Sequence, residues 1–567
     1  MSPVRGYESE PCHAIPGVVG VGYSSAVAGL RPGLVLAVDG PAAVDWDALA
    51  AEIGHALAVR ELAAKQVDMR EQFAAWPQIV ELTASAILPD DPDFAPLSQA
   101  SLADFFAEIP AADAVPDAVT VVFGPGAALV AHDQLWYADL PKRYAEAQIT
   151  AGGGRNLAQP AGTGPGTTRR LFYIDWPVLD RHRDTLIAGV DRWLDTQDPA
   201  AATWLEGPAL RSALGGLAAQ PFRTRPTFNT TSWGGHWAQQ QLSVNPEAPN
   251  TALGYELIAP ESGILVGDPD GARVEVPLQA LVALHPEEVL GTHVCGTFGA
   301  SFPIRFDYLD TVGGGNLSVH CHPRHDYMRR VFGWPYTQHE TYYMMVGGPG
   351  RKVFLGLRGG VDLEAFRHEA DSAVHDGVPF DVEQYVQSFP AEPHQLFLIP
   401  AGTPHGSGEG NVVLEISATP YLYSLRFYDW LRKDRAGRQR PVHVGHAFAN
   451  LDANRSGTAV TSDLIQQPRT VRSGAGWHEE VIGRLAEMFF EVRRVEMAHD
   501  AVLDDTTDHR FHILNVVQGD GIVLETAAGH RYDLAYAETL TVPAAAGAYR
   551  VHARGTERVR YVKALVA

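Results

Sequence analysis

Hydrophobic runs near the start of the chain alternate with turns and an alanine-rich stretch. Residues 34–38 predict a strand, and an Ala-rich segment that ends at about residue 60 predicts a helix after the turn Asp39-Gly40-Pro41. Residues 118–123 predict a second strand, which leads through Gly124-Pro125-Gly126 to an apolar run at 135–137. This alternation indicates an α/β domain, which we assign to residues 1–165 without a role. Neither turn carries a complete phosphate-binding fingerprint, so we interpret both as structural turns.

A stretch rich in Gly, Pro and Thr, residues 151–168, interrupts this pattern and predicts a linker or mobile loop. Beyond it, Leu186, Val190, Trp193 and Leu194 recur at helical spacing. We therefore predict a helical connector over residues 166–225.

From residue 221 onward, short alternating apolar runs broken by Gly, Pro and Asp predict the strands of a β-barrel or sandwich. We assign residues 226–435 to this β domain, with a helical insert at 361–390 where Leu363, Phe366 and Ala370 form a helical stripe. Residues 436–480 are polar and Arg-rich, and they predict a connector. Further short apolar runs predict a second, smaller β domain over 481–567, with strands at 489–495, 511–519, 522–525, 539–542 and 559–565. The predicted fold class is multi-domain α+β.

Composition and charge narrow the class of protein. The 567 residues carry 44 Lys and Arg against 67 Asp and Glu, a net charge of −23, which argues against nucleic acid as a partner. No run of about 18 apolar residues is present, so we expect no membrane span, and the first residues lack the apolar core of a signal peptide. The three cysteines, Cys12, Cys295 and Cys321, do not suggest a disulfide scaffold. We expect a cytoplasmic protein.

A His-x-His pair gives the strongest chemical signal. In Leu317-Ser318-Val319-His320-Cys321-His322-Pro323, an extended strand would place both imidazoles on one face, because side chains repeat every two residues. Glu340 follows at the head of an apolar, aromatic run, and His405 follows a Pro/Gly turn. Imidazole and carboxylate are ligands that Zn²⁺ and other divalent metals prefer. The four residues therefore predict a metal site.

The same segments resemble the two sequence signatures of the cupin β-barrel and, more narrowly, the type I phosphomannose isomerase (mannose-6-phosphate isomerase) family. The segments that carry this resemblance are 302–310, 317–323, 340–343, 399–405 and 425–430, with 233–235 and 286–291 as earlier landmarks. The resemblance covers about residues 230–435, and the C-terminal strands match the second cupin of that family more loosely. It implies two cupin domains after the N-terminal α/β domain. Residues 1–220 have no counterpart in the short members and resemble the extension of a longer branch.

The resemblance also implies roles for individual residues. His322, Glu340 and His405 match metal ligands, and His320 stands where the family usually has Gln. Imidazole is a competent ligand at that place, so the metal prediction includes His320. Glu415 matches an acid near the metal, and Arg426 matches an active-site Arg. The alternative for Glu415 and Arg426 is a structural ion pair.

One position departs from the family pattern. Many phosphomannose isomerases have a Lys two positions before the Glu ligand, and this chain has Gln338, which cannot act as an acid or base. Either another group moves the proton, with His339 and Glu415 as candidates, or the substrate is not mannose 6-phosphate. His512, in the second β domain, has no His-x-His partner, so we interpret it as structural and that domain as a metal-free cupin.

We therefore expect a metal-dependent aldose–ketose isomerase of a sugar phosphate, with mannose 6-phosphate and fructose 6-phosphate as the first pair to test. Zn²⁺ or another divalent metal would be the cofactor, and a small sugar phosphate the only predicted partner. The alternatives are a non-catalytic sugar-binding or regulatory protein on the same scaffold, and a cupin oxygenase or epimerase. The sequence does not predict the oligomeric state.

Overall fold

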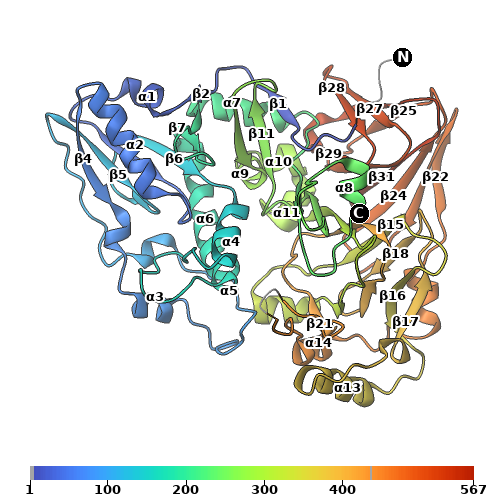
Figure 1. Ribbon diagram of the computed structural model, residues 1–567. Helices are drawn as coiled ribbons and strands as arrows, with labels where there is room; N and C mark the ends of the chain where they lie inside the picture. Colours follow the sequence, from blue (N-terminus) through green and yellow to red (C-terminus); the bar gives the residue numbers. More distant parts are fainter. Residues whose placement is uncertain (1–5, 435–436) are drawn as a thin grey trace. The chain divides into compact units, whose positions relative to one another are not determined.

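The computed structural model describes residues 6–434 and 437–567, and the chain divides into two compact units (Figure 1). The N-terminal unit contains Pro11–Leu217 and Gly263–His285. The C-terminal unit contains Met1–Glu10, Ala218–Ser262 and Pro286–Ala567. The predicted boundary between residues 435 and 436 lies outside the described residues.

A seven-stranded sheet of order β2-β8-β7-β6-β3-β5-β4 forms the centre of the N-terminal unit. The strands β3 (Val35–Asp39), β4 (Ala63–Asp68), β5 (Ala118–Phe123), β6 (Gln134–Asp139) and β7 (Arg192–Asp195) pair in parallel. At one edge, β8 (Thr203–Glu206) pairs antiparallel with both β7 and β2 (Gly20–Val21). A smaller sheet pairs β1 (Cys12–Ala14), β11 (Gly263–Gly267) and β12 (Arg273–Pro277). The predicted alternation of strands and helices is present.

The helices of this unit are α1 (Tyr23–Ala26), α2 (Trp46–Val59), α3 (Trp76–Leu82), α4 (Lys142–Thr150), α5 (Thr168–Arg170), α6 (Trp176–Leu186), α7 (Gly207–Leu217) and α9 (Leu278–Leu284). In α2, the Asp45 carboxylate accepts a hydrogen bond from the Ala48 amide at 3.0 Å and caps the first turn. The helix buries Leu49, Ile53 and Leu57 in the core against β3 and β5.

The segment predicted as a helical connector, residues 166–225, differs from the prediction. Strands β7 and β8 lie within it and extend the main sheet beside β6, so most of the segment completes the N-terminal unit. All four residues of β7 are buried. Because a strand buried on both faces shows no alternation, Trp193 and Leu194 were compatible with a helical pattern.

The C-terminal unit begins with two antiparallel sheets. One has the order β18-β15-β20-β13-β10-β9, formed by β9 (Thr227–Asn229), β10 (Leu253–Leu257), β13 (Ile304–Asp310), β15 (Glu340–Val346), β18 (Leu396–Ile399) and β20 (Val412–Ala418). The other has the order β17-β16-β19-β14-β21, formed by β14 (Val319–Cys321), β16 (Lys352–Leu357), β17 (Val386–Pro390), β19 (His405–Ser407) and β21 (Leu425–Tyr428). The helices are α8 (Trp237–Leu242), α10 (Pro286–Leu290), α11 (Thr292–Phe298), α12 (His325–Tyr327), α13 (Leu363–His375) and α14 (Val444–Asn450).

Two more antiparallel sheets end the chain. They contain β22 (Arg469–Gly474), β23 (Trp477–Gly483), β24 (Phe490–Met497), β26 (His512–Gln518), β29 (Thr539–Val542) and β31 (Val559–Val566) in one sheet, and β25 (Val502–Thr506), β27 (Gly521–Thr526), β28 (Arg531–Ala535) and β30 (Ala548–Ala553) in the other. Side chains from both sheets share one core, which includes Leu503, Leu514 and Val551. All five strands predicted after residue 481 are present.

Two further segments differ from their predictions. The helical part of the insert at 361–390 is α13. The last residues of the insert form β17, which is an edge strand of the sheet that contains β14. In the predicted connector 436–480, β22 and β23 are paired with each other and belong to the terminal sheet. The polar, Arg-rich pattern did not reveal them because β22 is an exposed edge strand.

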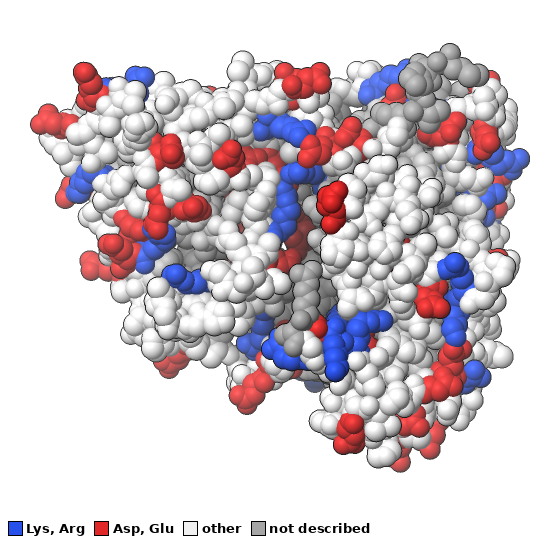
Figure 2. Space-filling view, in the orientation of Figure 1, with Lys and Arg blue, Asp and Glu red and all other residues white. Residues whose placement is uncertain are grey.

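On the face of the molecule in Figure 2, Lys and Arg side chains form several separate groups interleaved with acidic ones. Among residues 6–434 and 437–567, no helix combines the length and apolar character that crossing a bilayer requires.

Candidate metal centre

Four buried side chains converge between the two sheets that contain β14 and β15. His320 lies on β14 and His322 directly follows it, His405 begins β19, and Glu340 begins β15. One potential ligand atom from each lies within 4.8 Å of all the others. The antiparallel β14–β19 pair sets His320 opposite His405, which brings their rings to 4.3 Å between centroids. The structure therefore brings together the four residues predicted to form a metal site.

Backbone carbonyls orient all three imidazoles in the same way. His320 Nδ1 lies 3.0 Å from the Ser318 carbonyl oxygen, and His405 Nδ1 lies 2.9 Å from that of Thr403. His322 Nδ1 lies 3.3 Å from the Tyr423 carbonyl oxygen. A carbonyl accepts only from N–H, so the rings of His320 and His405 carry their proton on Nδ1 and present the Nε2 lone pair. This arrangement is typical of metal-binding histidines, whose second nitrogen is held by a neighbouring acceptor.

The electrostatics favour the protonation states that bind a metal. Burial lowers the pKa of His320 well below its ordinary value, and the neighbouring His405 and His322 add to this. Burial also lowers the pKa of His322, although Glu340 opposes the change. Burial alone would raise the pKa of Glu340, but His405 and His322 outweigh it and hold this pKa well below its ordinary value. Neutral imidazole and ionised carboxylate are the ligand forms that metal binding requires.

One buried atom indicates what the cluster lacks. His405 is fully buried, and its Nε2 makes no hydrogen bond within the described residues. Its nearest acidic atom is Glu340 Oε2 at 3.3 Å, and Glu340 also contacts His322 Nε2. A buried polar atom without a partner and a buried carboxylate are both costly. A divalent cation would satisfy both, so the residues present fit a metal with a three-nitrogen, one-oxygen ligand set.

A second buried cluster, of charged residues, lies beside these four. Arg305 on β13 forms an ion pair with Glu415 on β20 and donates a hydrogen bond to Ser417 Oγ at 2.6 Å. Its Nη1 lies 3.6 Å from Asp307 Oδ1. Burial raises the pKa of Glu415 well above its ordinary value against the opposing effect of Arg305, and raises that of Asp307 to about 6. The site therefore contains carboxyl groups that bind protons more readily than exposed ones do.

Gln338 connects the two clusters. It is 1% exposed, and with its amide oriented so that donors face acceptors, its oxygen accepts from Arg305 Nη2 at 2.9 Å. In the same orientation the amide nitrogen lies 3.1 Å from His322 Nδ1, and the amide oxygen lies 3.3 Å from His322 Nε2. Gln338 therefore occupies the space between the imidazoles and Arg305, where it contributes hydrogen bonds and no charge.

The other residues predicted to act in catalysis lie at different places. Arg426 on β21 is the cross-strand neighbour of His320, so the two side chains share a face, and Arg426 Nη1 donates to the Pro441 carbonyl at 3.1 Å. His339 directly precedes Glu340, and alternation along β15 directs it to the opposite face. Its Nδ1 accepts from the Ala401 amide at 3.2 Å. This placement does not support the predicted role of His339 as a proton carrier.

Sequence reasoning missed three residues of this site. Arg305 and Asp307 lie two positions apart in β13, a strand whose other residues before Asp310 are apolar or aromatic, and this spacing was a usable sign that both are directed inward. Tyr342 lies two positions after Glu340 on the same strand face. Its hydroxyl is buried without a hydrogen bond among the described residues, and its ring lies 5.7 Å from that of His405. In the terminal β unit, His512 Nδ1 is 2.7 Å from the Tyr549 hydroxyl, a contact of the structural kind that we predicted.

Comparisons with known proteins give two kinds of match. A family model described as a domain of unknown function (DUF8485) matches residues 22–219. Over part of its length the chain also resembles mannose-6-phosphate isomerases. The enzyme of that name from Streptococcus mutans serotype c is 24% identical over 327 residues, which covers 57% of this chain and 93% of the relative. Mannose-6-phosphate isomerase ManA from Bacillus subtilis is 22% identical over 314 residues, or 54% of this chain and 88% of the relative.

Among solved structures, the mannose 6-phosphate isomerase from Bacillus subtilis matches 61% of this chain and 99% of its own, with 18% identity and a TM-score of 0.48. The sequence relatives confirm the resemblance that the motifs predicted.

Proposed function

We propose that the C-terminal unit is a metal-dependent isomerase that interconverts an aldose phosphate and a ketose phosphate, with mannose 6-phosphate and fructose 6-phosphate as the first pair to test. The observation that carries this proposal is the convergence of three imidazoles and one carboxylate beside a buried acid. The relatives, which match this chain over most of their own length, support the choice of reaction. We also propose that both pairs of β-sheets are cupin barrels and that the terminal one is metal-free.

His320, His322, Glu340 and His405 would hold the metal, and a three-nitrogen, one-oxygen set favours Zn²⁺. When bound, such an ion supplies Lewis acidity that polarises the sugar oxygens. His320 is 6% exposed and the other three ligands at most 1%, so we propose that the sugar approaches from the side of His320.

Isomerisation moves one proton between C1 and C2 of the open-chain sugar, through an enediol, with no net change in oxidation. We assign this transfer to Glu415, because it is a buried carboxyl group beside the metal ligands, and its raised pKa favours binding the proton that it then returns to the substrate. Arg305 orients the Glu415 carboxylate through their ion pair, and Ser417 Oγ donates to Glu415 Oε1 at 2.8 Å. A carboxyl group fixed from two sides is suited to one proton-transfer geometry.

Arg426 would orient the substrate. It lies on the same face as His320, and a guanidinium makes charge-assisted hydrogen bonds to oxyanions and phosphate. Gln338 would position Arg305 and make no proton transfer, since an amide does not titrate.

The test is conversion of mannose 6-phosphate to fructose 6-phosphate by the purified chain. We expect turnover that depends on bound metal. A protein that is stabilised by mannose 6-phosphate but interconverts no hexose phosphate would instead be a sugar-binding protein. This alternative is motivated by Gln338, which stands where many phosphomannose isomerases have a Lys.

A further inference from the structure

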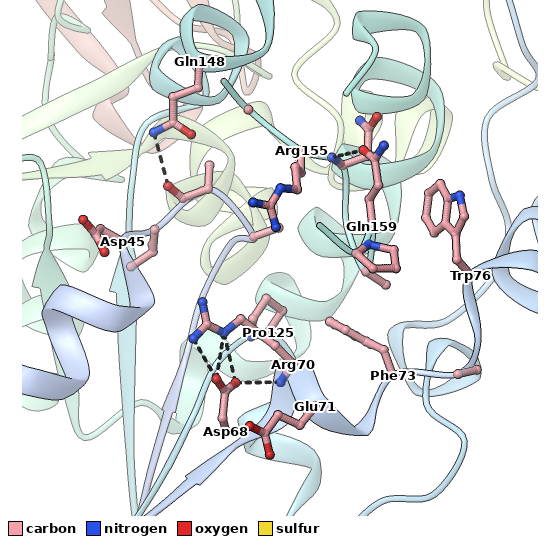
Figure 3. Close-up of a pocket in the computed structure, with 18 of the residues that line it drawn as sticks. Asp45, Asp68, Arg70, Glu71, Phe73, Trp76, Pro125, Gln148, Arg155 and Gln159 are labelled. Carbon is pink, nitrogen blue, oxygen red and sulfur yellow. Dashed lines mark hydrogen bonds and ion pairs between the residues drawn. The ribbon is translucent and has the colours of Figure 1, made fainter. Parts of the chain in front are cut away.

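The groove on the N-terminal unit in Figure 3 has a volume of about 800 Å³, but the polar groups that line it do not converge. Asp45 and Trp76 lie at opposite ends of the groove, with Arg155 between them. The carboxylate of Glu71 is directed away from this space. Ligand sites combine a concave surface with a few polar groups that act on one small volume. Such a convergence is present in the C-terminal unit, where a buried hydroxyl lies close to the candidate metal centre.

That hydroxyl belongs to Tyr342 on β15. In the antiparallel pairing, Tyr342 lies opposite Glu415 on β20, and Glu415 lies opposite Asp307 on β13. Two positions before Tyr342, Glu340 lies opposite Ser417. Because side chains two positions apart on a strand share a face, all five side chains lie on the same side of this sheet. Tyr342 is therefore a direct cross-strand neighbour of the proposed proton-transfer residue and one row away from the ligand carboxylate.

The hydroxyl of Tyr342 has no protein partner, although the side chain is fully buried. It makes no hydrogen bond within the described residues. The next residue, Tyr343, faces the opposite side of the strand, and its hydroxyl lies 2.9 Å from His394 Nδ1. A buried polar group without a protein partner is costly, so its presence calls for a bound group that completes its hydrogen bonding.

The surroundings of Tyr342 indicate where such a group would lie. Its ring is 5.7 Å from that of His405, with an angle of 72° between the two ring planes. Burial raises the pKa of Tyr342 well above its ordinary value, and Glu340 and Glu415 add to the rise. The hydroxyl is thus within electrostatic reach of both carboxylates, but it donates to neither. Because a neutral phenol is a hydrogen-bond donor, its proton is available to an oxygen atom bound between the metal ligands and Glu415.

The proposed isomerisation requires such a donor. When a carboxylate removes the proton from one carbon of the open-chain sugar, negative charge develops on the oxygen of the adjacent carbon. Donors that are fixed in advance at this position stabilise the charge strongly, because a buried site has little water to screen it. The guanidinium of Arg305 is already bound to Glu415 and Ser417. The hydroxyl of Tyr342 is bound to neither.

We propose that Tyr342 is a catalytic residue whose hydroxyl donates a hydrogen bond to the sugar oxygen that becomes negatively charged when Glu415 removes the proton from the adjacent carbon. The phenol keeps its proton, and no bond of Tyr342 is formed or broken. This role of Tyr342 rests on the proposed isomerase function, to which it adds the donor that stabilises the enediolate oxygen.

The experiment compares the zinc-loaded full chain with its Tyr342→Phe variant, which lacks only the hydroxyl. The kcat for mannose 6-phosphate should fall about 10²-fold, the usual cost of removing one donor to a developing oxyanion, while zinc content stays unchanged. In calorimetry, the affinity for 6-phosphomannonate, whose C1 carboxylate mimics the oxyanion, should fall about tenfold or more. The affinity for mannitol 6-phosphate, which has a neutral hydroxyl at C1, should change less than about threefold.

Tyr343→Phe is the matched control. It makes the same substitution at the next position of β15, on the opposite face of the strand, where the hydroxyl contacts His394. This variant should keep the wild-type kcat and both affinities. Without ligand, Tyr342→Phe should unfold at a urea concentration no lower than the wild type, because the hydroxyl that it removes has no partner. Tyr343→Phe should unfold at a lower one, because it loses the contact with His394.

Each result decides the role of Tyr342. A loss of kcat of about tenfold or more in Tyr342→Phe but not in Tyr343→Phe supports it. A smaller loss, an equal loss in both variants, or a loss of zinc from Tyr342→Phe overturns it, and so does a lower urea midpoint of Tyr342→Phe, which would reveal a protein partner. If the wild type interconverts no hexose phosphate, the proposed function fails. The affinities for 6-phosphomannonate then decide separately, since a weaker affinity of Tyr342→Phe supports the contact with the oxyanion and an equal one overturns it.

Discussion

His405 Nε2 lies 3.3 Å from Glu340 Oε2 and makes no hydrogen bond within the described residues. The structure orients this lone pair and that carboxylate toward one point, where His320 and His322 also converge. The proposed function depends on what occupies that point.

Replacement of the carboxylate ligand tests the metal site. Glu340→Gln removes the only anionic ligand of the cluster, so the affinity for Zn²⁺ should fall at least about 100-fold. Metal analysis after dialysis against a metal buffer measures this. Glu392→Gln, at an exposed glutamate, should keep a full complement of metal. Equal metal content in both variants would remove Glu340 from the ligand set.

Removal of the buried guanidinium tests the charged cluster. Arg305→Leu leaves Glu415 and Asp307 buried without their cation, and we expect a loss of about 3–5 kcal/mol in the free energy of unfolding. Urea denaturation of the C-terminal unit measures it. Adding Glu415→Gln and Asp307→Asn should restore part of the loss.

The matched control for that series is Arg531→Leu. Arg531 pairs with Glu525 at 2.9 Å on the surface, where the two side chains are 63% and 39% exposed, so loss of Arg531 should change stability by less than about 1 kcal/mol. If Arg305→Leu is equally mild, Arg305 does not hold the cluster together.

Glu415→Gln tests the proton transfer. The amide keeps the size of the side chain and removes its titratable proton, so kcat for mannose 6-phosphate should fall about 10²–10⁴-fold while metal content stays unchanged. If the variant keeps its turnover, a group other than Glu415 transfers the proton. If the variant loses its metal, Glu415 contributes to metal binding.

Asp139, at the end of β6, should make the stability of the N-terminal unit depend on pH. Burial raises its pKa to about 8, with Asp195, Glu275 and Asp180 adding to the rise and Arg183 opposing it. Because the folded state holds this proton more tightly than the unfolded chain, its stabilising effect is complete below pH 4 and is lost as pH rises through 8.

Asp139→Asn removes this dependence. At pH 8 the variant should exceed the wild type by at least about 1.4 kcal/mol in local stability, and near pH 4 the two should agree. Amide exchange of β6, corrected for its intrinsic pH dependence, measures the difference. An unchanged pH profile would show that Asp139 ionises normally.

The sequence predicted the metal cluster because local patterns encode it. Period-two alternation set His320 and His322 on one face, and the turn before His405 had a recognisable composition. The Arg305–Glu415 pair joins residues 110 positions apart, so no local pattern revealed it. The orientation of Gln338 likewise depends on Arg305, a partner on another strand.

The domain boundaries were harder to predict for a related reason. Strands β7 and β8 have only four residues each. For such short strands, pairing with neighbouring strands determines the position in the sheet more than the strand's own sequence does. Residues 263–285 belong to the N-terminal unit although they lie far along the chain, because β11 pairs with β1. Spatial pairing of this kind is absent from a linear pattern of polarity.

The most direct test measures metal content and conversion of mannose 6-phosphate to fructose 6-phosphate on the same samples, before chelation, after it, and after Zn²⁺ is restored. We expect one divalent ion per chain, loss of conversion when it is removed, and recovery in proportion to the Zn²⁺ rebound. Full conversion by metal-free protein, or none by fully loaded protein, would contradict the account.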